Sequence, residues 1–354
     1  MFQQTKREES KMEINTIAVD LAKNVFQVHG FSGAGERVLV KRVSRSRFEG
    51  LMRELPVGGE VVMEACGSGH FWGRFLQGLG YRVRLIPPQH VRAYVVGNKT
   101  DGKDADAIYQ ASRRRDLRAV PVKTVAQQDW LLAHRMRERR KKARVALMNQ
   151  VRGFLAERGW VCGRGVAALR QLVQDILARP AAGEVTDYFL KQLAVLWEEW
   201  RQLDGQMADA ERAIAEHFRS TVACQHIAEV EGIGPITASA AVAMVGDARS
   251  FRNGRQMAAW IGVTPKEHSS GETRRLGGMT KRGDPYLRTL LVHGARAAVR
   301  SALRKDDPRS RWIAALVQRR GHNKAVVAVA NKNVRIVWAM LTTGECYRPA
   351  TATV

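Results

Sequence analysis

The N-terminal part of the chain alternates between short apolar runs and amphipathic segments in an order that few folds accommodate. Three runs rich in β-branched residues come first, separated by turn-like stretches, and helix and strand patterns then alternate. The predicted strands are 14–20, 25–31, 36–43, 60–65 and 82–86, and the predicted helices are 45–55 and 70–80. With one more helix near residue 101, the order βββαβαβα is that of a ribonuclease H-like, α/β fold.

Carboxylates stand at the ends of two of these strands. Asp20 ends the first strand and Glu64 ends the fourth, which this topology places beside the first. The stretch GNKTDGKDADA at 97–107 adds three more acids. Asp101 and Asp104 are three residues apart and share one face of a helix, whereas Asp106 points elsewhere and is interpreted as an ordinary helix charge. We expect Asp20, Glu64, Asp101 and Asp104 to form a cluster that binds Mg²⁺ or Mn²⁺ beside a substrate phosphate.

The overall charge explains why such a cluster would meet phosphates. The chain has 354 residues with 58 Lys+Arg against 34 Asp+Glu, which gives a formal charge of +24. Nucleic acid is therefore the expected partner. Four widely spaced cysteines argue against a zinc site or a disulfide framework. Because no apolar run is long enough to span a membrane and no signal core follows the N-terminus, we expect a cytoplasmic, nucleoid-associated protein without a membrane partner.

The rest of the chain is predicted to be mainly helical. Helical spacing extends over 124–158, which includes the basic run RMRERRKKAR, and over 187–218, where leucines recur as in a coiled coil; GWVCGRG at 159–165 separates the two. The expected organisation is a disordered lead-in (1–12), the α/β domain (13–118), a helical coiled-coil linker (119–220), a mainly α C-terminal domain (221–345) and a tail (346–354).

Two motifs of the C-terminal domain carry possible chemistry. GIGPITA at 232–238 has the form of a helix-hairpin-helix turn, in which Gly232 and Gly234 let backbone N–H groups face a DNA phosphate; a plain corner between helices is the alternative. KEHSSGETRRLGG at 266–278 places Ser269 and Ser270 before a glycine and two arginines. By its residues alone this segment is most simply a turn, and His268 a polar loop residue. The alternative is that a serine hydroxyl attacks a phosphate whose charge Arg274 and Arg275 neutralise, with His268 as a base.

Several blocks together resemble the DEDD transposases of bacterial insertion sequences, the "one-ten" family and especially its "eleven-eleven" branch. The resemblance extends over about 14–343. The blocks are AVDLAKN at 18–24, MEACGSGHFW at 63–72, NKTDGKDADA at 98–107, EGIGPITA, GVTPKEHSSG and TKRGDPYLRTLLVHGAR. The joint order of these blocks is highly specific. At two points this chain departs from the family's pattern: Ser269 stands beside Ser270, so either serine could be the nucleophile, and Cys66 places a thiol of unknown role two residues after Glu64.

The resemblance implies a RuvC-like N-terminal domain, a coiled-coil linker and a helical transposase domain with a catalytic serine. Carried over by motif, Asp20, Glu64, Asp101 and Asp104 would be the metal ligands and Ser270 the nucleophile that forms a phosphoserine link to DNA. Family members are guided by a structured noncoding RNA that pairs with donor and target DNA. Their active site combines the acids of one subunit with the serine of another. We therefore expect a homodimer or homotetramer. The residues expected to contact nucleic acid are the two glycines of the helix-hairpin-helix turn, Gly232 and Gly234, and the cations Arg274, Arg275, Lys281 and Arg282.

Two other functions remain open from the sequence. A metal-dependent nuclease or Holliday-junction resolvase would use the same carboxylates with water as nucleophile and would not need Ser270. A non-enzymatic nucleic-acid-binding protein would need neither the acids nor the serine. Exonucleases with a DEDD set are disfavoured, because they usually carry Asp-x-Glu on the first strand and here Leu21 and Ala22 follow Asp20.

Overall fold

The computed structural model of the chain describes residues 13–95, 101–114, 116–179 and 185–348. The predicted lead-in (1–12) and most of the predicted tail lie outside these residues. The chain divides into two compact units, Met1–Val125 with Gly246–Phe251, and Ala126–Val245 with Arg252–Val354. In the ranges described, no helix combines the length and the apolarity that crossing a membrane requires.

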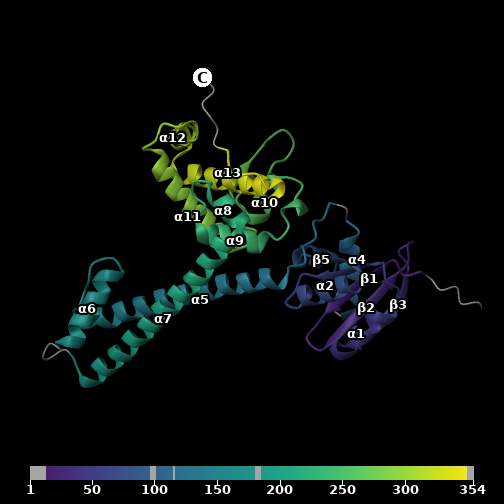
Figure 1. Cartoon of the computed structure of the whole chain (residues 1–354), viewed down its shortest axis with the longest axis horizontal. Coiled ribbons are helices and arrows are strands. Elements are labelled where there is room, and N and C mark those ends of the chain that lie inside the picture. The colour runs from purple at the N-terminus through teal and green to yellow at the C-terminus, as the bar shows by residue number, and fades with distance from the viewer. Residues whose placement is uncertain (1–12, 96–100, 115, 180–184, 349–354) are drawn as a thin grey trace, which may run out of the picture. The chain divides into compact units, whose positions relative to one another are not determined.

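A five-stranded sheet forms the centre of the first unit (Figure 1). Its strands are β1 (Thr16–Leu21), β2 (Val25–Phe31), β3 (Arg37–Ser44), β4 (Glu60–Glu64) and β5 (Arg82–Ile86). They lie in the order β3-β2-β1-β4-β5, with β1, β2 and β3 antiparallel and β1, β4 and β5 parallel. All five strands lie where the sequence pattern predicts them, and the unit is a mixed α/β structure.

Helices cover both faces of this sheet (Figure 1). α1 (Arg45–Glu54) and α2 (Gly69–Gly78) pack on one face, where Ile17 and Val19 of β1 join the core. Residue Ala18, between them, faces the other core, which α4 (Asp101–Ser112) covers together with the short helix α3 (Pro88–Val91) and the turn η1 (Arg92–Tyr94). This alternation follows from the two-residue period of a strand and decides which side chains of β1 face α4.

A distant stretch of the chain also belongs to this unit. Residues 246–251 contain the turn η2 (Ala248–Ser250). The guanidinium of Arg118 lies 3.5 Å from the centroid of the Phe251 ring and donates to Ser250 Oγ at 2.8 Å. Burial lowers the pKa of Arg118 to about 10, which leaves it charged near pH 7. The cation–π contact therefore anchors the stretch.

The second unit begins with three helices that share one core: α5 (Val125–Ala156), α6 (Val166–Ala178) and α7 (Asp187–Ser220). α5 and α7 correspond to the two long segments predicted from the sequence. Helix α6 was not predicted, although Leu169, Val173 and Ile176 have helical spacing and all three are buried. The buried residues include Leu147 and Leu155 of α5 and Leu193 and Trp200 of α7, so the three helices stabilise one another.

Part of the basic run on α5 is neutralised within the unit. Arg137 forms an ion pair with Glu211 of α7 at 2.7 Å, and Arg144 pairs with Asp204 of the same helix at 2.6 Å. Arg140 donates to the backbone oxygen of Gln206. Arg137, Arg140 and Arg144 thus hold α5 against α7, whereas Arg139, Lys141 and Lys142 of the same run are exposed.

The remaining helices of the second unit are α8 (Val222–Ala228), α9 (Pro235–Val245), α10 (Gly254–Ile261), α11 (Pro285–Ala302), α12 (Pro308–Arg320) and α13 (His322–Thr343). Between α10 and α11 lies a small antiparallel hairpin of β6 (Pro265–Glu267) and β7 (Leu276–Met279). Only a turn was expected in this segment, because two strands this short carry little apolar pattern. The unit is otherwise helical.

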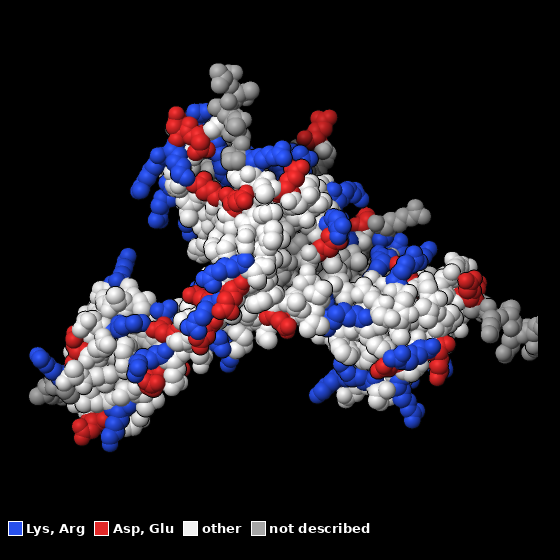
Figure 2. Space-filling view, viewed as in Figure 1, with Lys and Arg blue, Asp and Glu red and all other residues white. Residues whose placement is uncertain are grey.

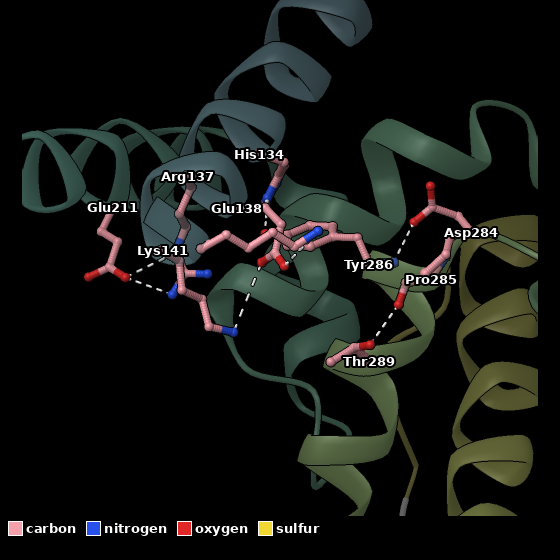
Figure 3. A network of polar contacts seen from close by, with 10 residues as sticks. His134, Arg137, Glu138, Lys141, Glu211, Asp284, Pro285, Tyr286 and Thr289 are labelled. Atoms are coloured by element: carbon pink, nitrogen blue, oxygen red, sulfur yellow. Dashed lines mark hydrogen bonds and ion pairs between the residues drawn. The ribbon is translucent and has the colours of Figure 1, made fainter. Parts of the chain in front are cut away.

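A buried chain of polar side chains joins α5, α7, α9 and α11, and Figure 3 shows two of its members, His134 and Tyr286. His134 lies 3.0 Å from the Tyr286 hydroxyl and 2.9 Å from Ser239 Oγ, which in turn lies 2.8 Å from His217. Burial, with the charge of Arg137 as a lesser cause, lowers the pKa of His134 to about 4. The ring is therefore neutral near pH 7 and has one donor and one acceptor nitrogen for its two hydroxyl partners.

The turn between α8 and α9 depends on close backbone packing. Gly232 has a φ of +92°, in the left-handed region. A side chain there would meet the Gly294 backbone oxygen of α11 at 2.7 Å, and one on Gly294 would meet the Gly232 oxygen at 1.8 Å. Gly234, two residues on, is exposed, and the first carbon of a side chain there would have open space for 4 Å around it. Close packing therefore explains why residue 232 is a glycine, but it does not explain the glycine at residue 234.

We expect Gly232→Ala to destabilise the second unit, because alanine adds the cost of a left-handed backbone, about 1–3 kcal/mol, to a clash with α11. Gly234→Ala is the matched control and should change stability by less than about 0.5 kcal/mol, the usual range for an exposed site. The measurement is the denaturation midpoint of the full chain. Equal midpoints for the two variants would contradict the packing explanation.

Candidate active site

The end of the β1–β4 pair brings two acids to one face of the sheet. The parallel register runs from Thr16 opposite Glu60 to Val19 opposite Met63, and Asp20 and Glu64 are the next residue on each strand. Because side chains alternate along a strand, Asp20 points to the same side of the sheet as Ala18, and Glu64 to the same side as Val62. Ala18 and Val62 both belong to the core that α4 covers. The two carboxylates therefore point to the side of the sheet that α4 covers, and both are half-buried.

A cavity at this position is lined by three of the four predicted acids. Its volume is about 720 Å³, and Asp20, Glu64 and Asp104 contribute to its wall. Asp104 comes from the first turns of α4. The side chain of Asp101 lies outside the described part of the structure. The fold therefore brings together acids that lie far apart in the sequence, as was predicted for these three.

Two other residues of the cavity wall were not predicted to have a role there. Arg92 of η1 brings a positive charge to a cavity that otherwise holds carboxylates, and Cys66 adds the thiol noted in the sequence. Arg92 lies in an irregular stretch after Pro87-Pro88 with no motif around it, so only the turn of the chain through α3 and η1 places it here.

Asp106 faces a different part of the unit. One carboxylate oxygen lies 2.7 Å from Nδ1 of His29 on β2, and the other accepts a hydrogen bond of 2.7 Å from Arg37 on β3. His29 is 2% exposed, so Asp106 supplies the partner of a buried imidazole. These contacts agree with the interpretation of Asp106 as a structural charge. On α4, Asp104 therefore lines the cavity, whereas Asp106 stabilises the fold.

The donor set of the cavity suits a hard divalent cation. Carboxylate oxygens are the ligands that Mg²⁺ and Mn²⁺ prefer, and three such groups surround one solvent-accessible space. Within the described residues, however, no three His, Cys, Asp or Glu side chains are close enough to one another to hold an ion. The cavity thus has the required chemistry without a closed coordination shell.

The candidate serine lies in the second unit, at the tip of the β6–β7 hairpin. Ser270 and Thr273 exchange backbone hydrogen bonds of 3.3 and 3.2 Å around Gly271, whose φ is +55°. Ser269 Oγ donates to Glu267 Oε1 at 2.8 Å and accepts from the Arg275 amide. The Ser270 hydroxyl is exposed and makes no hydrogen bond to the described residues. The two serines are therefore not equivalent: Ser269 holds the hairpin together, and Ser270 is available.

The residues predicted to contact nucleic acid lie in three turns of this unit. Gly234, Arg274, Arg275, Lys281 and Arg282 are exposed, and Gly232 is half-buried against α11. Lys281 has a φ of +56°, the only left-handed residue other than glycine in the described ranges. Its turn packs closely on the end of α10, since a side chain on Gly262 would meet the Arg282 nitrogen at 2.6 Å. A fixed backbone thus presents two exposed cations.

Known transposases match the chain over most of its length. The transposase IS116/IS110/IS902 family matches residues 224–311, and a transposase family of the DEDD, IS110 type matches residues 17–158. The chain is 48% identical to a probable family 20 transposase of Pseudomonas aeruginosa, over 96% of this chain and 100% of that protein. It is 42% identical to the transposase for insertion sequence element IS1111A of Coxiella burnetii, over 97% and 94%. It is 33% identical to the transposase for IS1328 of Yersinia enterocolitica, over 94% and 98%.

We expect Asp106→Ala to lower the stability of the first unit by about 1–3 kcal/mol, because the buried His29 loses its acceptor. Asp116→Ala is the control, since Asp116 is an exposed acid paired with the exposed Arg114. Chemical denaturation measures the difference. Loss of DNA cleavage by a normally stable Asp106→Ala protein would instead place Asp106 in the active site.

Proposed function

The chain belongs to the IS116/IS110/IS902 family of insertion-sequence transposases, and from that premise we propose that two separate groups of residues carry its DNA recombination. The first is the carboxylate set of the α/β unit, and the second is the serine of the β6–β7 hairpin. The enzyme is a DNA transposase, so its substrates are phosphodiesters of donor and target DNA. The observation that best supports the proposal is the convergence of Asp20, Glu64 and Asp104 on one cavity.

The α/β unit is proposed to be RuvC-like. Its strand order and the acids at the ends of β1 and β4 support this, as does α4, which brings Asp104 to the same face. Asp20, Glu64 and Asp104, with Asp101, would hold Mg²⁺ or Mn²⁺. A bound divalent ion would neutralise phosphate charge and orient the ester. Arg92 would add a positive charge against a non-bridging phosphate oxygen.

Ser270 is proposed as the nucleophile. Its Oγ would form a bond to phosphorus as the bond from phosphorus to one bridging oxygen breaks. The departing strand end takes up a proton as the serine loses its own, and the other strand end stays joined as a phosphoserine ester. Because one phosphate ester replaces another, rejoining needs no outside energy source. Arg274 and Arg275 would stabilise the charge on the attacked phosphate.

A noncoding RNA from the element is proposed to select the DNA sequences. Base pairing would supply sequence recognition, and the protein would bind the nucleic-acid backbones through its excess of 24 positive charges. The exposed turns at Gly234, at Arg274 and Arg275, and at Lys281 and Arg282 support such backbone contacts. The acids and the serine belong to different units of the chain, which suits a homodimer or homotetramer whose subunits complete each other's sites.

We expect strand exchange to require Mg²⁺ or Mn²⁺ and to stop in EDTA. Asp104→Asn should abolish strand exchange while nucleic-acid affinity stays nearly unchanged, because the variant removes one ligand charge from the cavity. Asp116→Asn, which removes an exposed acid of the same unit, is the control and should remain active. The assay compares recombined DNA with bound DNA for each variant. Full activity in EDTA would rule out the metal.

The serine is tested by trapping the covalent intermediate. A substrate nicked near the cleavage site should leave protein joined to DNA, visible as a band that survives denaturation. Ser270→Ala should eliminate this band and retain nucleic-acid binding, whereas Ser269→Ala should keep most of it, with a less stable hairpin. Cleavage to free phosphate ends with no adduct, and with little effect of Ser270→Ala, would favour a water-using resolvase.

A further inference from the structure

A shallow basic groove runs along the outer face of α11, and none of its residues has a role in the function proposed above. Its volume is about 600 Å³. The lining residues all come from α11 and the turn that follows it: His293, Arg296, Ala297, Arg300, Ser301, Arg304 and Lys305. Figure 2 shows Lys and Arg side chains projecting from the edge of the molecule formed by α11 and α12. The opposite face of α11 is apolar and buried, so the helix is held rigidly by its core.

Three arginines of this groove have no side-chain partner within the described part of the chain. Arg296, Arg300 and Arg304 are exposed, and no guanidinium among them forms an ion pair or a hydrogen bond with any residue that the structure describes. On α5, by contrast, Arg137 and Arg144 are neutralised by acids of α7. Like charges four residues apart on a helix repel each other, at a cost of about 0.2–0.5 kcal/mol per pair. An anion from outside the chain would relieve this repulsion.

The spacing of the row fits a strand of nucleic acid. Four helical residues rise about 6 Å, which separates Arg296 from Arg300 on α11, and Arg304 follows in the turn after Ala302, so the row extends for roughly 12 Å. One strand of a duplex rises about 3.4 Å for each phosphate, so the row is long enough to face about three or four phosphates. Ala297 leaves the floor of the groove open, and the hydroxyl of Ser301 offers a further donor.

The α8–α9 turn packs against the side of α11 away from this row. The backbone of Gly232 contacts Gly294, one residue after His293, and Glu231 binds Lys305 at 2.8 Å at the other end of the groove. The Gly232 contact lies on the packed side of α11, and the Glu231–Lys305 ion pair reaches one end of the groove. Of the cations that line the groove, Lys305 is the one with an acid of the described chain beside it.

We propose that the row Arg296, Arg300 and Arg304 binds the phosphodiester backbone of a nucleic-acid strand, independently of its base sequence. The inference rests on the proposed function, to which it adds a position for the substrate or the guide. DNA and RNA share this backbone chemistry, and affinity measurements with each of them distinguish the two. The row is assigned to phosphates because phosphate and sugar oxygens accept at least half of all protein–DNA hydrogen bonds, and arginine is one of their usual donors.

The experiment compares two triple variants of the full chain. The row variant carries Arg296→Gln, Arg300→Gln and Arg304→Gln. The control carries Lys191→Gln, Arg201→Gln and Arg212→Gln, which remove three exposed charges from α7. Affinity for a short labelled duplex DNA and for a labelled RNA hairpin is measured over a series of NaCl concentrations. Glutamine keeps the helix propensity of arginine, and the single variant Arg300→Gln serves if the triple variant does not fold.

For the row variant, the log–log slope of affinity against salt should fall by about 2–3 with the nucleic acid that occupies the groove, since each phosphate that is no longer neutralised removes roughly 0.7–0.9. Arg300→Gln alone should lower it by about one third of that. A fall confined to duplex DNA assigns the row to DNA, and a fall confined to RNA assigns it to the guide. If the slopes with both nucleic acids equal those of the control, the inference is wrong. That result leaves the proposed function standing, since the Ser270 adduct tests it separately.

Discussion

Backbone hydrogen bonds between the parallel strands β1 and β4 determine which side chains stand at the end of the sheet. Their register runs without a shift to Val19 and Met63, so that Asp20 and Glu64 follow side by side. A slip of one residue would turn either carboxylate to the face covered by α1 and α2, into a core of Phe, Trp and Met side chains. The burial of an unpaired charge there would cost far more than the strand pairing provides. The hydrophobic alternation that fixes the sheet therefore also fixes the acids, and α4 adds Asp104 because its own apolar face must cover the same side.

The excess of positive charge serves two distinct purposes in the helical unit. On α5, Arg137 and Arg144 are paired with acids of α7 and hold two long helices together, so these charges contribute to structure. On α11 and in the exposed turns, most of the cations face solvent. Composition alone does not separate these groups, since in the basic run RMRERRKKAR Arg137 and Arg144 are paired with acids of α7 while Arg139 and Lys142 are exposed. The partners of each arginine, rather than the local density of arginines, indicate where a polyanion can bind.

The sheet could be predicted well from the sequence, because strands of the first unit carry clear apolar alternation and their order leaves few topologies. The position of Asp20, Glu64 and Asp104 around one cavity, and the separate position of Asp106, agree with the sequence pattern, whereas the metal site predicted for these acids stays a prediction. The pattern missed α6, and it missed the β6–β7 hairpin, whose strands are too short and too exposed to show a period. Arg92 and the row on α11 were not found either, because their neighbours arise from tertiary packing. The difference between Ser269 and Ser270 likewise depends on one contact, from Ser269 to Glu267, that no spacing rule reveals.

The proposed mechanism requires that the carboxylates of one unit and the serine of the other act on the same phosphodiester. The yield of covalent protein–DNA adduct formed by Asp20→Asn, a variant in which Ser270 is intact, tests this requirement. We expect this variant to bind DNA and RNA normally but to form no adduct, because the serine cannot attack a phosphate that the carboxylate site has not prepared. Adduct formation at the normal yield by Asp20→Asn would contradict the mechanism, since the serine would then act without the acids.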